Sequence, residues 1–216
     1  MLRGRQMVAL ALLTVTVCAP GTERLAFAQA TSVVDLAVPD PAAVVLDPGT
    51  TALLAIDFLQ STCAPNPSCI AALPAVADAL ASAREAGALV VYSVHPAPDN
   101  VILPDVAPLP SETVFAAVPG DKFFNSSLDE LLKQHGTTTL VLTGVSSNNG
   151  VMYTAGAAIQ RGYTVVVATD GIAAATDLAT TVALWQLLHG PGANPQNNPL
   201  QARAVTLSQT NLMTYK

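Results

Sequence analysis

Charged residues are scarce in this chain, and basic residues are the scarcest. Only 11% of its 216 residues are charged, and 9 Lys and Arg stand against 15 Asp and Glu. Aromatic residues contribute 5% while hydrophobic residues contribute 51%, which excludes a disordered chain and is typical of one domain with a large buried core. The acidic balance disfavours nucleic acid and anionic membranes as partners, so we expect neither.

Long apolar runs are also missing, since none reaches the roughly 20 residues that a membrane-spanning helix needs. The most apolar N-terminal run, residues 7–18, follows Arg3 and Arg5 and precedes two small-residue cleavage patterns ending at Ala28 and Ala30. This order of features is typical of a secretory signal peptide.

We therefore expect residues 1–30 to be a signal peptide and residues 31–216 to form the exported domain, secreted or periplasmic, with no membrane attachment after cleavage. A lipoprotein anchored through Cys18 fits less well, because Val17 stands where a small residue is expected before the modified cysteine.

Cysteine is nearly absent, with 3 residues in all. Outside the leader only Cys63 and Cys69 remain, and they flank a Pro-rich stretch. In an oxidising compartment a disulfide is the favoured interpretation. Closing so short a loop contributes about 2 kcal/mol in the chain-entropy treatment, so the bond would shape a loop rather than hold the fold together.

What the chain does contain is a repeated alternation of two patterns. Continuous apolar runs, typical of strands buried on both faces, are residues 51–57, 88–93, 138–143, 163–169 and 203–207. Segments of helical period lie between or after them, at residues 74–85, 127–134, 150–160 and 177–188. The alternation predicts an α/β fold with a three-layer, doubly wound, mainly parallel, Rossmann-like sheet, and Pro-rich residues 96–120 and 190–199 are expected to be surface loops.

Polar residues at the carboxyl ends of parallel strands are the natural site residues of such a sheet. Asp57 closes the first predicted strand, although an Asp there could equally cap the next turn. Lys122 lies between a turn and two aromatic residues, where an ordinary surface lysine is also expected. The loop at residues 143–150 leads into a helix, whose free N–H groups can hold an anion or oxyanion.

Taken together, these blocks resemble the signature blocks of the isochorismatase-like, or cysteine hydrolase, superfamily. They are a strand ending in Asp57 with Gln60 three residues later, Lys122 before Phe124, and the segment Leu142-Thr-Gly-Val-Ser-Ser-Asn-Asn-Gly-Val-Met-Tyr-Thr-Ala155. The similarity spans residues 45–207, and its order and spacing are more specific than any single motif.

The resemblance also implies a chemistry. Most members carry a cysteine just before the valine that matches Val151, but this chain has Gly150 there, which excludes the usual covalent thioester. Glycine at this position resembles true isochorismatases, in which the aspartate acts as general acid toward an enol-ether carbon and water completes hydrolysis. Asp57 would take that role, while Lys122 would raise its reactivity and hold a substrate carboxylate.

Further site residues follow from the resemblance. A cis peptide is expected near Val145 and Ser146. Metal-dependent relatives place an aspartate two residues before a His-Pro, whereas Ser93 precedes His95 here, so we expect no metal and no cofactor.

Members often form dimers or tetramers, so a homo-oligomer is compatible with the sequence. The residues expected to bind a small-molecule substrate are Gln60, His95, Phe124, Val145, Ser146 and Asn149.

Three functions remain open on the sequence. The first is an exported hydrolase that acts on a small carboxylated or enol-ether substrate through Asp57. The second is a catalytically silent binding protein that retains the pocket. The third is an amidase with a relocated nucleophile at Ser146, Ser147 or Cys63, which is disfavoured because the serines lack a visible base and Cys63 is explained by Cys69.

Overall fold

The computed structural model describes residues 36–96 and 101–216. The predicted signal peptide lies outside the described residues. In the described part, no helix combines the length and apolarity that crossing a membrane requires.

A six-stranded sheet forms the centre of the domain, in the order β4-β3-β2-β5-β6-β7, and every neighbouring pair in it is parallel. A second, two-stranded parallel sheet joins β1 to β8. The strands are β1 (Val44–Leu46), β2 (Thr51–Ile56), β3 (Leu89–Val94), β4 (Thr113–Ala116), β5 (Thr139–Val145), β6 (Thr164–Ala173), β7 (Val205–Ser208) and β8 (Met213–Tyr215).

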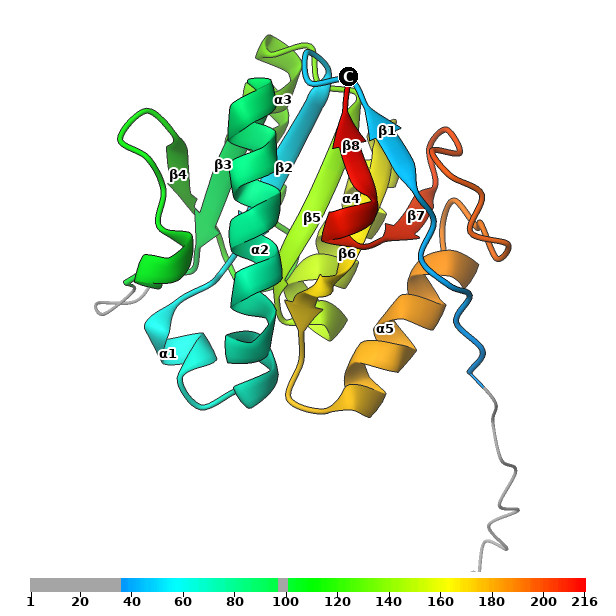
Figure 1. The fold of residues 1–216 in the computed structure, drawn as a ribbon, viewed down its shortest axis with the longest axis horizontal. Helices are drawn as coiled ribbons and strands as arrows, with labels where there is room; N and C mark the ends of the chain where they lie inside the picture. The colour runs from blue at the N-terminus through cyan, green and yellow to red at the C-terminus, as the bar shows by residue number, and fades with distance from the viewer. Residues whose placement is uncertain (1–35, 97–100) are drawn as a thin grey trace, which may run out of the picture. The chain divides into compact units, whose positions relative to one another are not determined.

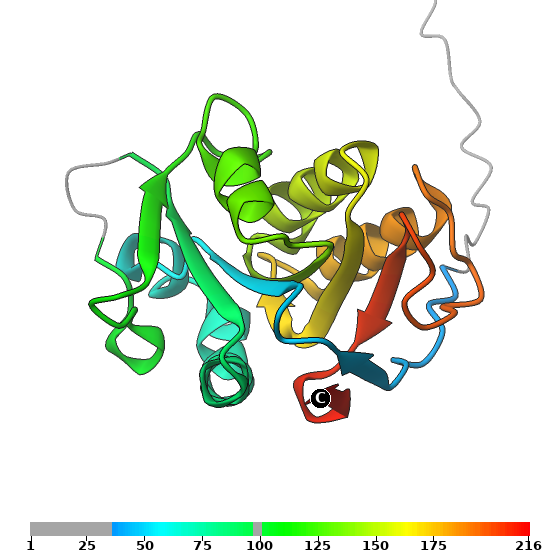
Figure 2. The same cartoon turned by 90° about the horizontal axis from the view of Figure 1, so that it is seen from above.

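Helices cover both faces of the large sheet, which gives three layers (Figures 1 and 2). Side chains from β2 alternate between the two cores: Leu53 packs with α2, whereas Leu54 packs with the helices on the other face. The predicted three-layer, doubly wound parallel fold is therefore confirmed. The helices are α1 (Gln60–Cys63), α2 (Pro67–Ala86), α3 (Leu128–Gln134), α4 (Met152–Gln160) and α5 (Asp177–His189), with short turns η1 (Pro104–Val106), η2 (Ser147–Val151) and η3 (Thr210–Leu212).

The predicted start of α2 is wrong, and two other helix ends lack the caps that their residue types would suggest. Helix α2 begins seven residues before Pro74, because Asn66 caps it with a side chain that accepts from Cys69 N. Ser127 makes no capping hydrogen bond, because it is the Ser126 hydroxyl that accepts from Leu128 N. Gly190 is not left-handed as a C-cap glycine would be, unlike Gly87 after α2.

The two expected surface loops carry more structure than predicted. Residues 101–120 include η1 and the edge strand β4. In the 190–199 loop, Asn194 and Asn197 are buried. Their side chains bond the backbone of β7 at Val205 O and at Leu207 N and O. This loop therefore satisfies polar groups that an edge strand would otherwise leave unpaired.

Because all six strands of the sheet run in the same direction, their carboxyl ends gather at one edge. In Figure 1 this edge lies toward the bottom, where α1 and the start of α5 are also found. The edge is where α/β proteins of this architecture bind ligands.

Candidate active site

Asp57 is the first residue after β2 and is held by backbone contacts on both sides. Its N–H donates to Ser93 O at 3.1 Å, and its own carbonyl accepts from Leu59 N at 2.8 Å. Its backbone is left-handed, with φ of +52°, a conformation that Asp tolerates better than most residues. Asp57 is 7% exposed, so its carboxylate is largely desolvated but still reachable.

Lys122 comes from the loop between β4 and α3, 65 positions along the chain from Asp57. Its side chain is fully buried, and its Nζ lies 2.6 Å from Asp57 Oδ2. The ammonium also donates to Val118 O at 3.3 Å. The backbone of Lys122 is fixed from α4, because its N–H donates to Thr154 Oγ1 at 3.1 Å. The two residues singled out in the sequence thus form one buried ion pair.

Ser93, the fifth residue of β3, completes the surroundings of the carboxylate. It is buried, and its hydroxyl donates to Asp57 Oδ1 at 3.0 Å. Both carboxylate oxygens of Asp57 therefore accept a hydrogen bond, one from an ammonium and one from a hydroxyl. The sequence interpretation had treated Ser93 only as a missing metal ligand, although its place at a strand end was a usable signal.

Gly150 is buried in η2, beside the ion pair. A Cβ at this position would lie 3.8 Å from Lys122 Cε and 3.1 Å from Ile56 Cγ2. Any side chain introduced at Gly150 would therefore start next to the ammonium stem. The peptide bond between Val145 and Ser146 is cis, at the position where the family resemblance placed one.

The remaining predicted substrate-binding residues surround the site at different depths. Val145 is buried, Ser146 and His95 are partly buried, and Gln60, Phe124 and Asn149 are exposed. No hydrogen bond joins any of them to the ion pair. The Nδ1 atom of His95 is buried without a hydrogen-bond partner.

Cys63 and Cys69 are joined by the predicted disulfide, with a Cα–Cα distance of 5.2 Å, and both are buried. The bond links α1, which follows Asp57 closely, to the first turn of α2. Since both sulfurs are bonded, the described residues contain no free thiol.

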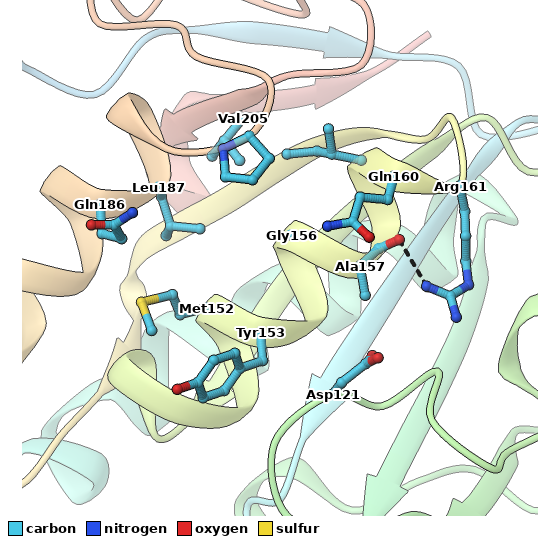
Figure 3. A pocket seen from close by; sticks show the side chains of 12 residues that line it. Asp121, Met152, Tyr153, Gly156, Ala157, Gln160, Arg161, Gln186, Leu187 and Val205 are labelled. Atoms are coloured by element: carbon cyan, nitrogen blue, oxygen red, sulfur yellow. Dashed lines mark hydrogen bonds between the residues drawn. The ribbon is translucent and has the colours of Figure 1, made fainter.

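A cavity of about 470 Å³ lies on the outer side of α4, where α5 also contributes to its wall (Figure 3). Asp121, Tyr153, Gly156, Arg161 and Gln186 are among its lining residues, but neither Asp57 nor Lys122 is. This cavity is therefore distinct from the ion-pair site. The described residues include no group of three or more His, Cys, Asp or Glu placed to hold a metal ion.

The molecule is thus a doubly wound α/β protein. Its candidate site, a buried acid and a buried amine, lies at the carboxyl edge of the parallel sheet. The isochorismatase domain matches residues 51–195, and the chain belongs to the isochorismatase family of hydrolases.

Individual relatives agree with this assignment. Maleamate amidohydrolase of Pseudomonas putida is 30% identical over 146 residues, which cover 54% of this chain and 68% of that protein. Streptothricin hydrolase of Streptomyces noursei is 38% identical over 118 residues, but these cover 48% of this chain and only 43% of that protein. The fold is similar to that of a cysteine hydrolase from Pseudomonas syringae, with a TM-score of 0.66 and 19% identity over 81% of this chain and 93% of that one.

Proposed function

We propose that this protein is an exported hydrolase that acts on a small carboxylated or enol-ether substrate through Asp57, without a covalent thioester. The observation that carries the proposal is the buried pair of Asp57 and Lys122, 2.6 Å apart, with Gly150 rather than a nucleophilic side chain beside it. An acid and an amine in contact can move a proton, but neither is the thiol that a thioester intermediate requires.

The pair holds one transferable proton. With the proton on Lys122 the pair is ionic, and with the proton on Asp57 it is a neutral acid and amine, so the total charge is zero in both states. Because Asp57 is the reachable member and Lys122 is fully buried, a substrate would meet the carboxyl group. Ser93 holds the other carboxyl oxygen and thereby limits rotation of the group.

In the proposed reaction, Asp57 donates this proton to the terminal carbon of an enol ether, and the carbon–carbon double bond supplies the electrons for the new C–H bond. The resulting oxocarbenium ion takes up water at the oxygen-bearing carbon, and the released proton returns to the carboxylate. The hemiketal then collapses to a ketone and an alcohol. The net reaction consumes one water and needs no oxidant.

Export is part of the proposal because of two independent features. Residues 1–30 have the order of a signal peptide, and the disulfide between Cys63 and Cys69 is a bond that persists in oxidising compartments. Detection of the mature N-terminus near Gln29 or Thr31 by mass spectrometry of protein from the extracytoplasmic fraction would support export, and an intact leader in the cytoplasmic fraction would contradict it.

The catalytic test compares Asp57→Asn with Asp78→Asn, a matched substitution at an exposed position on α2. Ketone or aldehyde release from a panel of small enol ethers is followed by NMR. We expect at least a hundredfold loss of kcat/KM in Asp57→Asn and none in Asp78→Asn. Ligand binding without turnover in the unmodified protein, with affinity unchanged in Asp57→Asn, would instead establish a silent binding protein.

A second variant tests the role of Gly150. The Gly150→Cys change puts a thiol next to Lys122, and we expect iodoacetamide to add one label per chain to the folded variant and none to the disulfide-intact protein. Failure of the thiol to react in a folded variant would contradict the assignment of Gly150 to the nucleophile position.

A further inference from the structure

Positive charge is distributed unevenly in this fold. Within the part of the chain that the structure describes, Lys122 is the only lysine or arginine at the carboxyl edge of the sheet. The others lie in the last turn or at the C-cap of a helix, just before a strand, or at the chain end beside the start of β2, all positions at the opposite edge. They are Arg84, Lys133, Arg161, Arg203 and Lys216.

Two of the three described arginines are also engaged in other contacts. Arg84 forms an ion pair with Glu112 at 2.8 Å. The Arg161 guanidinium donates to Ala157 O and lies 4.6 Å from the centre of the Phe123 ring. Neither guanidinium is therefore free to meet a ligand at Asp57.

Negative charge, in contrast, is found on the site edge. Asp105 lies in η1, in the connection from β3 to β4. Asp170 lies in the second half of β6 and accepts from Thr210, which follows β7, and Asp177 begins α5. The edge thus combines several carboxylates with one ammonium, and that ammonium is already neutralised. An anion entering this edge meets repulsion from the acidic residues and, among the residues that the structure describes, no unpaired lysine or arginine.

Lys122 does not supply a positive charge that an incoming anion could bind. Its side chain is fully buried, and two of its three N–H groups are used by Asp57 Oδ2 and Val118 O. The expected role of holding a substrate carboxylate would require breaking the ion pair inside the protein. Leaving the Asp57 carboxylate without its partner in a desolvated position is strongly unfavourable.

The rim of the site suits an uncharged ligand. Val118, whose carbonyl accepts from Lys122 Nζ, is 40% exposed, and Phe124, two residues after Lys122, is 56% exposed. These two residues therefore offer exposed apolar and aromatic surface in the segment that carries Lys122. An acidic surrounding also favours a reaction in which positive charge develops, as it does in an oxocarbenium ion.

Building on the proposed function, we infer that the substrate is uncharged at the part that enters the site, an enol ether without a carboxylate. The geometry assigns this preference to the carboxyl edge, where residues 36–96 and 101–216 place no lysine or arginine except the paired Lys122. The preference is one of substrate class, so it can be tested separately from the identity of the natural substrate.

The test uses 2-methoxyacrylamide and 2-methoxyacrylate, which have nearly the same shape and differ in charge. Cleavage of either ether releases methanol, measured by NMR at pH 8, where imidazole groups carry little charge. After division by each compound's uncatalysed rate, we expect kcat/KM to favour the amide at least tenfold. A kcat/KM for 2-methoxyacrylate equal to or greater than that for the amide would overturn the inference, although the proposed reaction would still hold.

A charge-introducing variant makes the test sharper. Phe124→Arg adds a guanidinium at the rim, and Phe124→Gln removes the same ring without adding charge. We expect the carboxylate-to-amide ratio of kcat/KM to rise about tenfold in Phe124→Arg relative to Phe124→Gln. An unchanged ratio would show that missing positive charge is not the cause of the preference.

Binding of both compounds is measured in parallel by saturation-transfer NMR. This measurement separates a failure of the proposed hydrolysis from a failure of the inferred preference for an uncharged substrate. If neither ether is cleaved, the proposed chemistry fails, and tighter binding of the amide would still support the inference. Tighter or equal binding of the carboxylate, or binding of neither compound, would contradict it.

Discussion

The buried ion pair predicts an unusual pattern of stability when its two members are removed singly and together. We consider Asp57→Asn, Lys122→Met and the double variant. Asp57→Asn leaves an ammonium with no exposed surface beside a neutral amide, whereas Lys122→Met leaves a carboxylate that is 10% exposed and still bonded to Ser93. Both single variants should be destabilised, and Asp57→Asn should be the worse of the two.

The magnitudes follow from the geometry. Unit charges 2.6 Å apart attract by about 6 kcal/mol at an effective dielectric constant of about 20. Desolvation of both ions opposes this by several kcal/mol each, so the pair as a whole contributes little net stability. Removing one partner forfeits the attraction but keeps the desolvation of the other, which costs about 3–5 kcal/mol. Removing both should cost only about 1–2 kcal/mol, since no charge then remains buried.

Urea unfolding followed by circular dichroism measures these differences, with the disulfide kept intact and the slopes compared to verify two-state behaviour. The expected coupling energy in the double-mutant cycle is at least 3 kcal/mol. Single variants that each lose less than about 1 kcal/mol, with effects that simply add in the double variant, would mean that the two side chains are hydrated and unpaired. That result would also remove the basis of the proposed proton transfer.

Three further outcomes are expected. Gly144→Ala should lower the free energy of unfolding by at least about 3 kcal/mol, because the φ of Gly144 is +146° and a Cβ would overlap strand β2. The matched change Gly156→Ala places its Cβ in open space and should leave the thermal unfolding temperature unchanged or raised. Replacing Cys63 and Cys69 by serine should lower the free energy of unfolding by about 2 kcal/mol, and an unchanged urea midpoint would argue against the bond. Burial raises the pKa of Tyr92 to about 12. The folded state therefore binds more protons than the unfolded state above pH 10, and the free energy of unfolding should fall between pH 10 and pH 12. A urea midpoint that stays constant over this pH range would contradict the shift.

The local hydrophobic pattern was sufficient to predict the buried strands of the large sheet, but not its edge strand β4 or the short strands β1 and β8. Strands β2, β3, β5, β6 and β7 were all predicted, because strands covered on both faces need continuous apolar sequence. Strand β4 was missed because it lies in a Pro-rich segment at the sheet edge, with Val114 exposed. Strands β1 and β8 are three residues long and acquire their structure only by pairing with each other.

The fold class, the family and the candidate site residues Asp57, Lys122 and Gly150 could be proposed from the linear chain, since hydrophobic periodicity and motif spacing are properties of the chain. The folded chain was needed to show that Asp57 and Lys122 are in contact, that Ser93 holds the second carboxylate oxygen, and that the other described lysines and arginines lie at the opposite edge of the sheet. Contacts between residues 36 or 65 positions apart depend on how strands are ordered in the sheet, and a linear pattern does not encode which of its polar residues will share one edge.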